Sequence, residues 1–156
     1  MAAINQITRE DVLDFGDACK YGHPHFSGST LDLYQQIATE SAIYPGQGTP
    51  LGLAYVALKL NGEAGEFAEH VGKAMRDDRL MNVIHDGEYH IDAISFESLT
   101  PERRDLIIKE IGDVLWYLSA ACNELGISLS EAATINLEKL CDRAERNALR
   151  GSGDNR

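Results

Sequence analysis

Two pairs of acidic residues stand in the middle of apolar stretches of this 156-residue chain. Glu63 and Glu66 lie within LNGEAGEFAEH, and Glu110 and Asp113 lie within KEIGDVLWYL. Residues three apart share one face of an α-helix, so each pair projects from one side of a helix. A carboxylate buried without a partner on an apolar helix face would be very costly. A shared cation would stabilise both pairs.

The ligand atoms that these pairs offer are hard carboxylate oxygens, which favour Mg²⁺, with Mn²⁺ as the alternative, over zinc. Magnesium commonly retains waters and binds substrate phosphates, so the pairs predict phosphate chemistry. Spacing alone leaves a second interpretation open, in which the acids form exposed salt bridges such as Lys59 with Glu63 and Glu69 with Lys73. A di-iron bundle would require two Glu-x-x-His motifs, and no histidine here follows a glutamate by three residues.

A polar, largely cationic stripe is expected on the last helix. Its members are spaced by three or four residues and therefore share one face: Asn136, Lys139, Arg143, Arg146 and Arg150. Lysine and arginine can clamp phosphate oxygens, and a carboxamide can bond a sugar or a base. The alternative is a solvated face with pairs such as Asp142 and Arg146, which applies best to the two outer arginines.

Four helices are expected to position these side chains, two of them starting at a threonine followed by proline. They run from Ser29 or Thr30 to Tyr44, from Leu51 to about Arg76, from Thr100-Pro101 to Gly126, and from the capping-box pattern at Ser128 towards Leu149. Short connections between them predict an all-α, antiparallel bundle. Residues 27–156 are expected to form this single domain, whereas the pattern specifies no structure for residues 1–26.

Two features interrupt the helical pattern. Residues 79–99 alternate weakly in polarity and contain Asp86-Gly87, which predicts a short hairpin or an irregular excursion. The second helix contains three glycines, each of which costs about 1 kcal/mol relative to alanine. We expect close packing of another helix to compensate for Gly52, Gly62 and Gly65.

The bulk composition excludes several classes of function. A net charge of -11 opposes binding to nucleic-acid polymers, and no run of Lys or Arg offsets it. The longest apolar run, around Val114 to Cys122, is far shorter than the roughly 20 residues of a membrane span, and residues 1–20 lack a signal-peptide pattern. Three cysteines without CxxC spacing are typical of reduced thiols. We therefore expect a cytoplasmic protein that binds no membrane.

The acidic pairs and the last helix together resemble the MazG-like branch of the all-α nucleoside triphosphate (NTP) pyrophosphohydrolases, particularly its compact phage and bacterial members. The resemblance covers roughly residues 31–156 and rests on YQQIATESAIYP, LKLNGEAGEFAEHVGKAMRD, KEIGDVLWYL, INLEKLCDR and GSGDNR. It implies a four-helix-bundle-like fold. It also implies an enzyme that cleaves an NTP or dNTP to its monophosphate and pyrophosphate. It also implies a homodimer or homotetramer, located in the host cytoplasm if the gene is carried by a phage.

The resemblance implies roles for individual residues as well. Magnesium would be bound by Glu63, Glu66, Glu110 and Asp113, and the nucleotide by Asn136, Lys139 and Arg143, with Lys73 a weaker candidate for a phosphate contact. Gly62 departs from the family, because many members carry there a glutamate proposed to help activate the attacking water. The long gap between Glu66 and Glu110 makes residues 79–99 an insertion. His70, one turn beyond Glu66, lies within reach of the acidic cluster.

Three functions stay open at the level of the sequence. The leading one is hydrolysis of canonical or modified dNTPs, with dGTP or dCTP as first candidates by resemblance. The second is a phosphoribosyl-ATP pyrophosphohydrolase, which shares the fold and the acidic pairs. The third is a catalytically silent helical oligomer that acts as a regulatory module.

Overall fold

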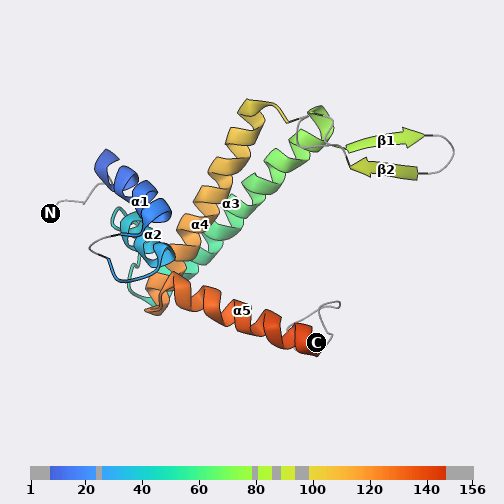
Figure 1. Cartoon of the computed structure of the whole chain (residues 1–156). Helices are drawn as coiled ribbons and strands as arrows, with labels where there is room; N and C mark the ends of the chain where they lie inside the picture. Colours follow the sequence, from blue (N-terminus) through green and yellow to red (C-terminus); the bar gives the residue numbers. More distant parts are fainter. Residues whose placement is uncertain (1–7, 24–25, 79–80, 86–88, 94–98, 147–156) are drawn as a thin grey trace. The chain divides into compact units, whose positions relative to one another are not determined.

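The computed structural model describes residues 8–23, 26–78, 81–85, 89–93 and 99–146, with only the backbone in 81–93 (Figure 1). In chain order the elements are α1 (Arg9–Tyr21), α2 (Thr30–Thr39), α3 (Pro50–Asp77), β1 (Met81–His85), β2 (Tyr89–Ala93), α4 (Pro101–Leu125) and α5 (Leu129–Glu145). The all-α class is confirmed, with a small hairpin added. Helices α2 to α5 are the four expected from the sequence, although α2 ends at Thr39 and not at Tyr44. Helix α1 forms where the pattern specified no structure.

The chain divides into two compact units. Residues 1–53 and 118–156 make up the first unit, which holds α1, α2, α5 and the adjoining ends of α3 and α4. Residues 54–117 make up the second unit, which holds the rest of α3 and α4 together with the hairpin. The grouping of residues 27–156 into a single domain stays a prediction.

In the second unit, α3 and α4 run side by side, and β1 and β2 connect them (Figure 1). The strands pair antiparallel, with Val83 opposite Ile91, which confirms the hairpin expected within 79–99. Its expected turn at Asp86-Gly87 lies outside the described residues. At the base of the hairpin, Arg103 Nε donates to Asp78 Oδ2 at 3.2 Å and so ties the start of α4 to the end of α3.

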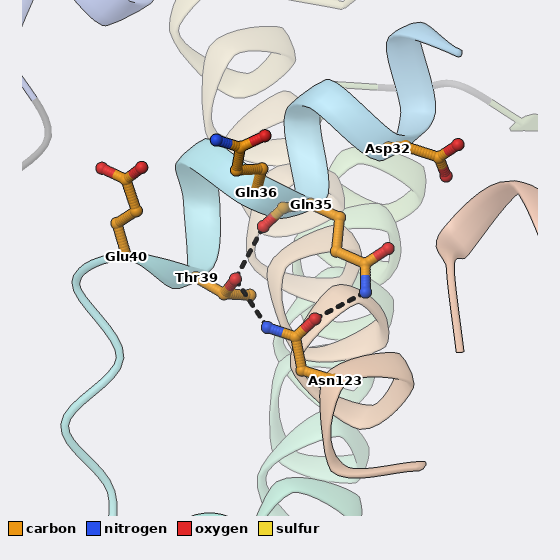
Figure 2. A pocket seen from close by; sticks show the side chains of 6 residues that line it. All are labelled: Asp32, Gln35, Gln36, Thr39, Glu40 and Asn123. Carbon is orange, nitrogen blue, oxygen red and sulfur yellow. Dashed lines mark hydrogen bonds between the residues drawn. The ribbon is translucent and has the colours of Figure 1, made fainter. Parts of the chain in front are cut away.

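In the first unit, hydrogen bonds between side chains join α2 to the end of α4, next to the corner between α4 and α5 (Figure 2). Gln35 Nε2 donates to Asn123 Oδ1 at 2.6 Å, and Asn123 Nδ2 donates to Thr39 Oγ1 at 2.7 Å. The start of α5 is capped as the sequence predicted, since Ser128 Oγ accepts from the backbone nitrogen of Glu131 at 3.0 Å. These bonds fix where α5 leaves the corner.

Gly52 is the one glycine of α3 at which the expected close packing occurs. A Cβ atom there would lie 2.5 Å from the carbonyl oxygen of Gly46 and 2.8 Å from Oε2 of Glu124. Glu124 is itself held in place, because it accepts from the hydroxyl of Tyr44 at 2.6 Å. The same expectation is wrong for Gly62 and Gly65, where an added Cβ would meet no described atom within 4 Å.

Candidate active site

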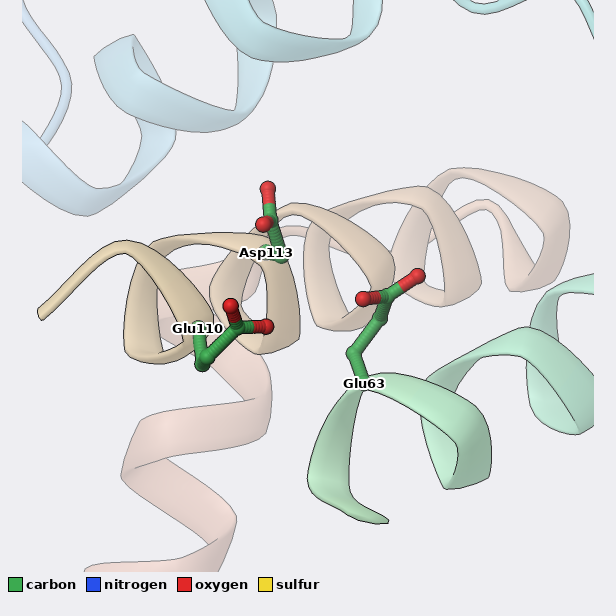
Figure 3. A group of neighbouring side chains, drawn as sticks. All are labelled: Glu63, Glu110 and Asp113. Atoms are coloured by element: carbon green, nitrogen blue, oxygen red, sulfur yellow. The ribbon is translucent and has the colours of Figure 1, made fainter. Parts of the chain in front are cut away.

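The second unit brings three of the predicted metal ligands together. Glu63 projects from α3 towards Glu110 and Asp113 on α4 (Figure 3). One carboxylate oxygen from each residue lies within 4.8 Å of the corresponding oxygens of the other two. Oxygen ligands of a magnesium ion are about 3 Å apart when adjacent and about 4 Å apart when opposite, so side-chain rotations would bring these oxygens onto one cation. An all-carboxylate donor set also fits a hard divalent ion.

Glu66 is not part of this group of three. Its side chain is exposed on α3, one helical turn beyond Glu63. Its negative charge nevertheless acts on the group, since it contributes to raising the pKa of Glu63. The role of Glu66 as a fourth ligand stays a prediction.

The electrostatics of the group favour a bound cation. The pKa of the Glu63 carboxyl is raised, first by burial and then by the negative charges of Glu66 and Asp113, while Lys59 opposes the shift. Like charges that are close and partly removed from water resist ionisation. A divalent cation would reverse this effect, because it stabilises the ionised form of every carboxylate around it.

This shift predicts that Glu63→Gln stabilises the metal-free protein at neutral pH. Because the pKa of Glu63 is raised in the fold, its contribution to stability is present below its ordinary pKa and lost as pH rises through the raised value. Removing the charge should therefore raise the free energy of unfolding by up to about 1 kcal/mol. Thermal melts in EDTA at pH 7 measure the change. A lower melting temperature for Glu63→Gln would contradict the repulsion.

Of two further candidate residues of α3, His70 lies beside these carboxylates, and Lys73 forms a salt bridge within the helix. His70 places Nε2 3.7 Å from Oε1 of Glu110. Lys73 pairs with Glu69 one turn before it on the same helix, at 2.5 Å, so the salt-bridge interpretation is confirmed for this pair. A role of Lys73 in binding phosphate stays a prediction.

The polar stripe on α5 belongs to the first unit, and its members differ in exposure and in hydrogen bonding. Asn136 and Lys139 are exposed, whereas Arg143 is only 6% exposed. Arg146 pairs with Asp142, with Nε donating to Oδ2 at 3.0 Å, which confirms the salt-bridge interpretation there. Arg150 lies outside the described residues. The nucleotide contacts assigned to Asn136, Lys139 and Arg143 stay predictions.

An open hollow of about 360 Å³ in the first unit was not expected from the sequence. Polar side chains of α2, of the residue that follows it and of the end of α4 line it: Asp32, Gln35, Gln36, Thr39, Glu40 and Asn123 (Figure 2). Several of them bond to one another, and Asp32 also accepts from the backbone nitrogen of Ser130 at 2.9 Å. The hollow is therefore built around the joint that holds α5. The polar side chains within α2 were the only feature of the sequence that could have indicated this hollow.

Comparisons with known proteins identify the family of the chain. The family model of the MazG nucleotide pyrophosphohydrolase domain matches residues 53–147, a range that contains both acidic pairs and the polar residues of α5. The chain is also 41% identical over 129 residues to the Gene 37 protein of Mycobacterium phage L5, covering 81% of this chain and 98% of that relative. No solved structure matches. None of the described helices is both long and apolar enough to cross a lipid bilayer. The chain belongs to the MazG nucleotide pyrophosphohydrolase domain family.

Proposed function

We propose that this protein is a Mg²⁺-dependent pyrophosphohydrolase that cleaves an NTP or dNTP to its monophosphate and pyrophosphate. Membership of the family supports nucleotide pyrophosphohydrolase activity in general. The observation that carries the proposal is the convergence of three carboxylate oxygens, from Glu63, Glu110 and Asp113, within 4.8 Å of one another. In a chain with a net charge of -11, these carboxylates repel one another and would also repel a phosphate. A bound divalent cation would remove both repulsions, because the carboxylates and the phosphate can bind it together.

The metal ligands in this proposal are the three grouped carboxylates, with Glu66 as the fourth. When bound, Mg²⁺ would neutralise phosphate charge and make a bound water more acidic. The protein's own part is to hold four acidic groups on two adjacent helices, so that the ligands need little reorganisation. We assign the role of base for the attacking water to a carboxylate of this group, because Gly62, the residue before Glu63, has no side chain that could act as one.

The nucleotide is bound, in this proposal, by polar side chains outside the acidic group. Lys139 and Arg143 of α5 bind phosphate oxygens, Asn136 bonds the sugar or base, and Lys73 is a weaker phosphate contact. Positively charged side chains are needed to bind the triphosphate, because this acidic chain would otherwise repel it. dGTP, dCTP or a modified dNTP is the first substrate to examine.

A homodimer or homotetramer is part of the same proposal. Large apolar side chains are exposed on the long helices, including Leu58, which is 76% exposed, and Leu137, which is 64% exposed. Such side chains are common in the interfaces of helical oligomers. Light scattering of the purified protein measures the assembly.

The deciding experiment measures products from a panel of dNTPs, NTPs and phosphoribosyl-ATP, with Mg²⁺, with Mn²⁺ and with excess EDTA. We expect equal amounts of monophosphate and pyrophosphate, and loss of both products in EDTA, because the ligand set needs a divalent ion. Release of inorganic phosphate with a diphosphate would contradict the bond that we propose is cleaved. Turnover of phosphoribosyl-ATP alone would support the second function, and absence of turnover on every substrate would support the silent oligomer.

A further inference from the structure

Glu110 is the most buried carboxylate of the acidic group, with only 9% of the residue exposed. An ionised carboxylate in such a position needs partners, because burial removes the water that would solvate it. Glu63 and Asp113 are acidic and cannot serve. A neighbouring group that can donate a hydrogen bond is the imidazole of His70, whose Nε2 lies 3.7 Å from Oε1 of Glu110.

The surroundings of the imidazole indicate which nitrogen carries its proton. Nδ1 of His70 is buried and has no hydrogen-bond partner among the described residues. A proton on Nδ1 would leave a buried donor unsatisfied and would turn the lone pair of Nε2 towards the carboxylate, which is repulsive. The tautomer protonated on Nε2 removes that repulsion, and the buried Nδ1 is then an unpaired acceptor among the described residues. This tautomer directs an N–H group at Glu110.

We propose that His70 is a positioning residue for Glu110, an inference that rests on the proposed function. Its Nε2–H group holds one oxygen of the Glu110 carboxylate, and this leaves the other oxygen for the cation shared with Glu63 and Asp113. The distance of 3.7 Å is longer than a hydrogen bond, and hydrogen bonds of this kind often close only when ligands bind. His70 itself contacts neither the nucleotide nor the cation.

The placement of His70 on α3 supports this role. It follows Glu63 by seven residues, or two helical turns, so both side chains lie on the same face of α3. Glu110 on α4 can therefore meet Glu63 through one oxygen and His70 through the other. Partners that orient metal ligands in this way typically account for 10- to 100-fold in metal affinity.

The test is Mn²⁺ binding to the full-length protein, measured by electron paramagnetic resonance of the free ion without nucleotide. His70→Gln places an amide N–H near the position of Nε2, whereas His70→Asn reaches only to the position of Nδ1, and His70→Leu has no donor. We expect the Asn and Leu variants to bind Mn²⁺ at least about 10-fold more weakly, and the Gln variant to stay within about 3-fold of the wild type. The Mg²⁺ concentration for half-maximal hydrolysis should rise by the same factors.

The outcomes separate this inference from the proposed function. A wild-type protein that binds Mn²⁺ and hydrolyses nucleotides, with unchanged affinity in the Leu and Asn variants, would overturn the role of His70 alone. A Gln variant as weak as the Leu variant would show a packing role and overturn it too. A wild-type protein that neither binds Mn²⁺ nor turns over substrate would overturn the proposed function and this inference with it. Circular dichroism confirms folding, and the polar Asn variant keeps the test decisive if the Leu variant unfolds.

Discussion

Asp113→Asn is expected to lower kcat/KM for nucleotide hydrolysis by more than about 100-fold, because it removes a ligand charge and not only an outer partner of a ligand. The change is nearly isosteric, and Asp113 is exposed, so the helices should be unaffected. Removing one of several mutually repelling carboxylates should, if anything, stabilise the metal-free protein. Activity should therefore fall while the helical content stays the same. Glu66→Gln is expected to have the same effect if Glu66 is the fourth ligand.

The matched control for Asp113→Asn is Asp105→Asn, which makes the same chemical change at another exposed position of α4. Initial rates over a range of Mg²⁺ concentrations should leave the control within about 2-fold of the wild type, as is usual for surface changes away from a site. A variant at Asp113 with normal turnover and normal dependence on Mg²⁺ would remove this residue from the metal site. Equal loss in both variants would point to a general effect of charge on α4.

The acidic site was largely predictable because helical periodicity is a local property of the sequence. Spacing of three residues indicated that Glu63 and Glu66, like Glu110 and Asp113, share a helix face, and the apolar surroundings indicated that the two faces meet. Spacing could not indicate that Glu66 would lie on the exposed side of the group. The difference depends on how α3 is rotated about its axis against α4, and packing over the whole helix determines that rotation.

The helices were predictable for a similar reason, since capping signals are local. Thr100 accepts from the backbone nitrogen of Arg103 at 3.2 Å, as the threonine and proline there indicated. The helix α1 was missed, although Thr8 and Asp11 form a reciprocal capping box at its start. Of its apolar side chains, Val12 and Leu13 are more than half exposed, whereas Ala18 is buried. With few apolar residues in a short helix, α1 gives a weaker sequence signal than the long helices.

Long-range polar contacts were the part of the fold that no local pattern could indicate. Gln35 is separated from Asn123 by 88 residues, and nothing in the sequence indicates that their carboxamides meet. Gln35 is only 7% exposed, yet all of its polar atoms are used. Besides the bond to Asn123, its Nε2 donates to the carbonyl of Ile127 at 3.1 Å, and its Oε1 accepts from the backbone nitrogen of Leu129 at 2.6 Å.

Gln35→Leu is therefore expected to destabilise the first unit by about 2–4 kcal/mol, because it leaves the buried N–H group of Leu129 and the carbonyl of Ile127 without a side-chain partner. Gln36→Leu is the matched control, since it makes the same change at the next, exposed position of α2. Urea denaturation followed by circular dichroism measures both. A Gln35→Leu variant as stable as the Gln36→Leu control would show that the joint is not a determinant of stability.

Gln35→Glu tests the direction of each hydrogen bond in the joint. One oxygen of the introduced carboxylate can still accept from Leu129, but the other faces Asn123 Oδ1 and the carbonyl of Ile127, which are both acceptors. Ionisation is therefore disfavoured in the fold, and the pKa of the new carboxyl should be raised. The variant should be unstable at neutral pH and regain stability as the pH falls through that raised value, because protonation restores a donor. A loss of stability that does not change with pH would mean that the packing of Gln35, and not its donated bonds, holds α5 in place.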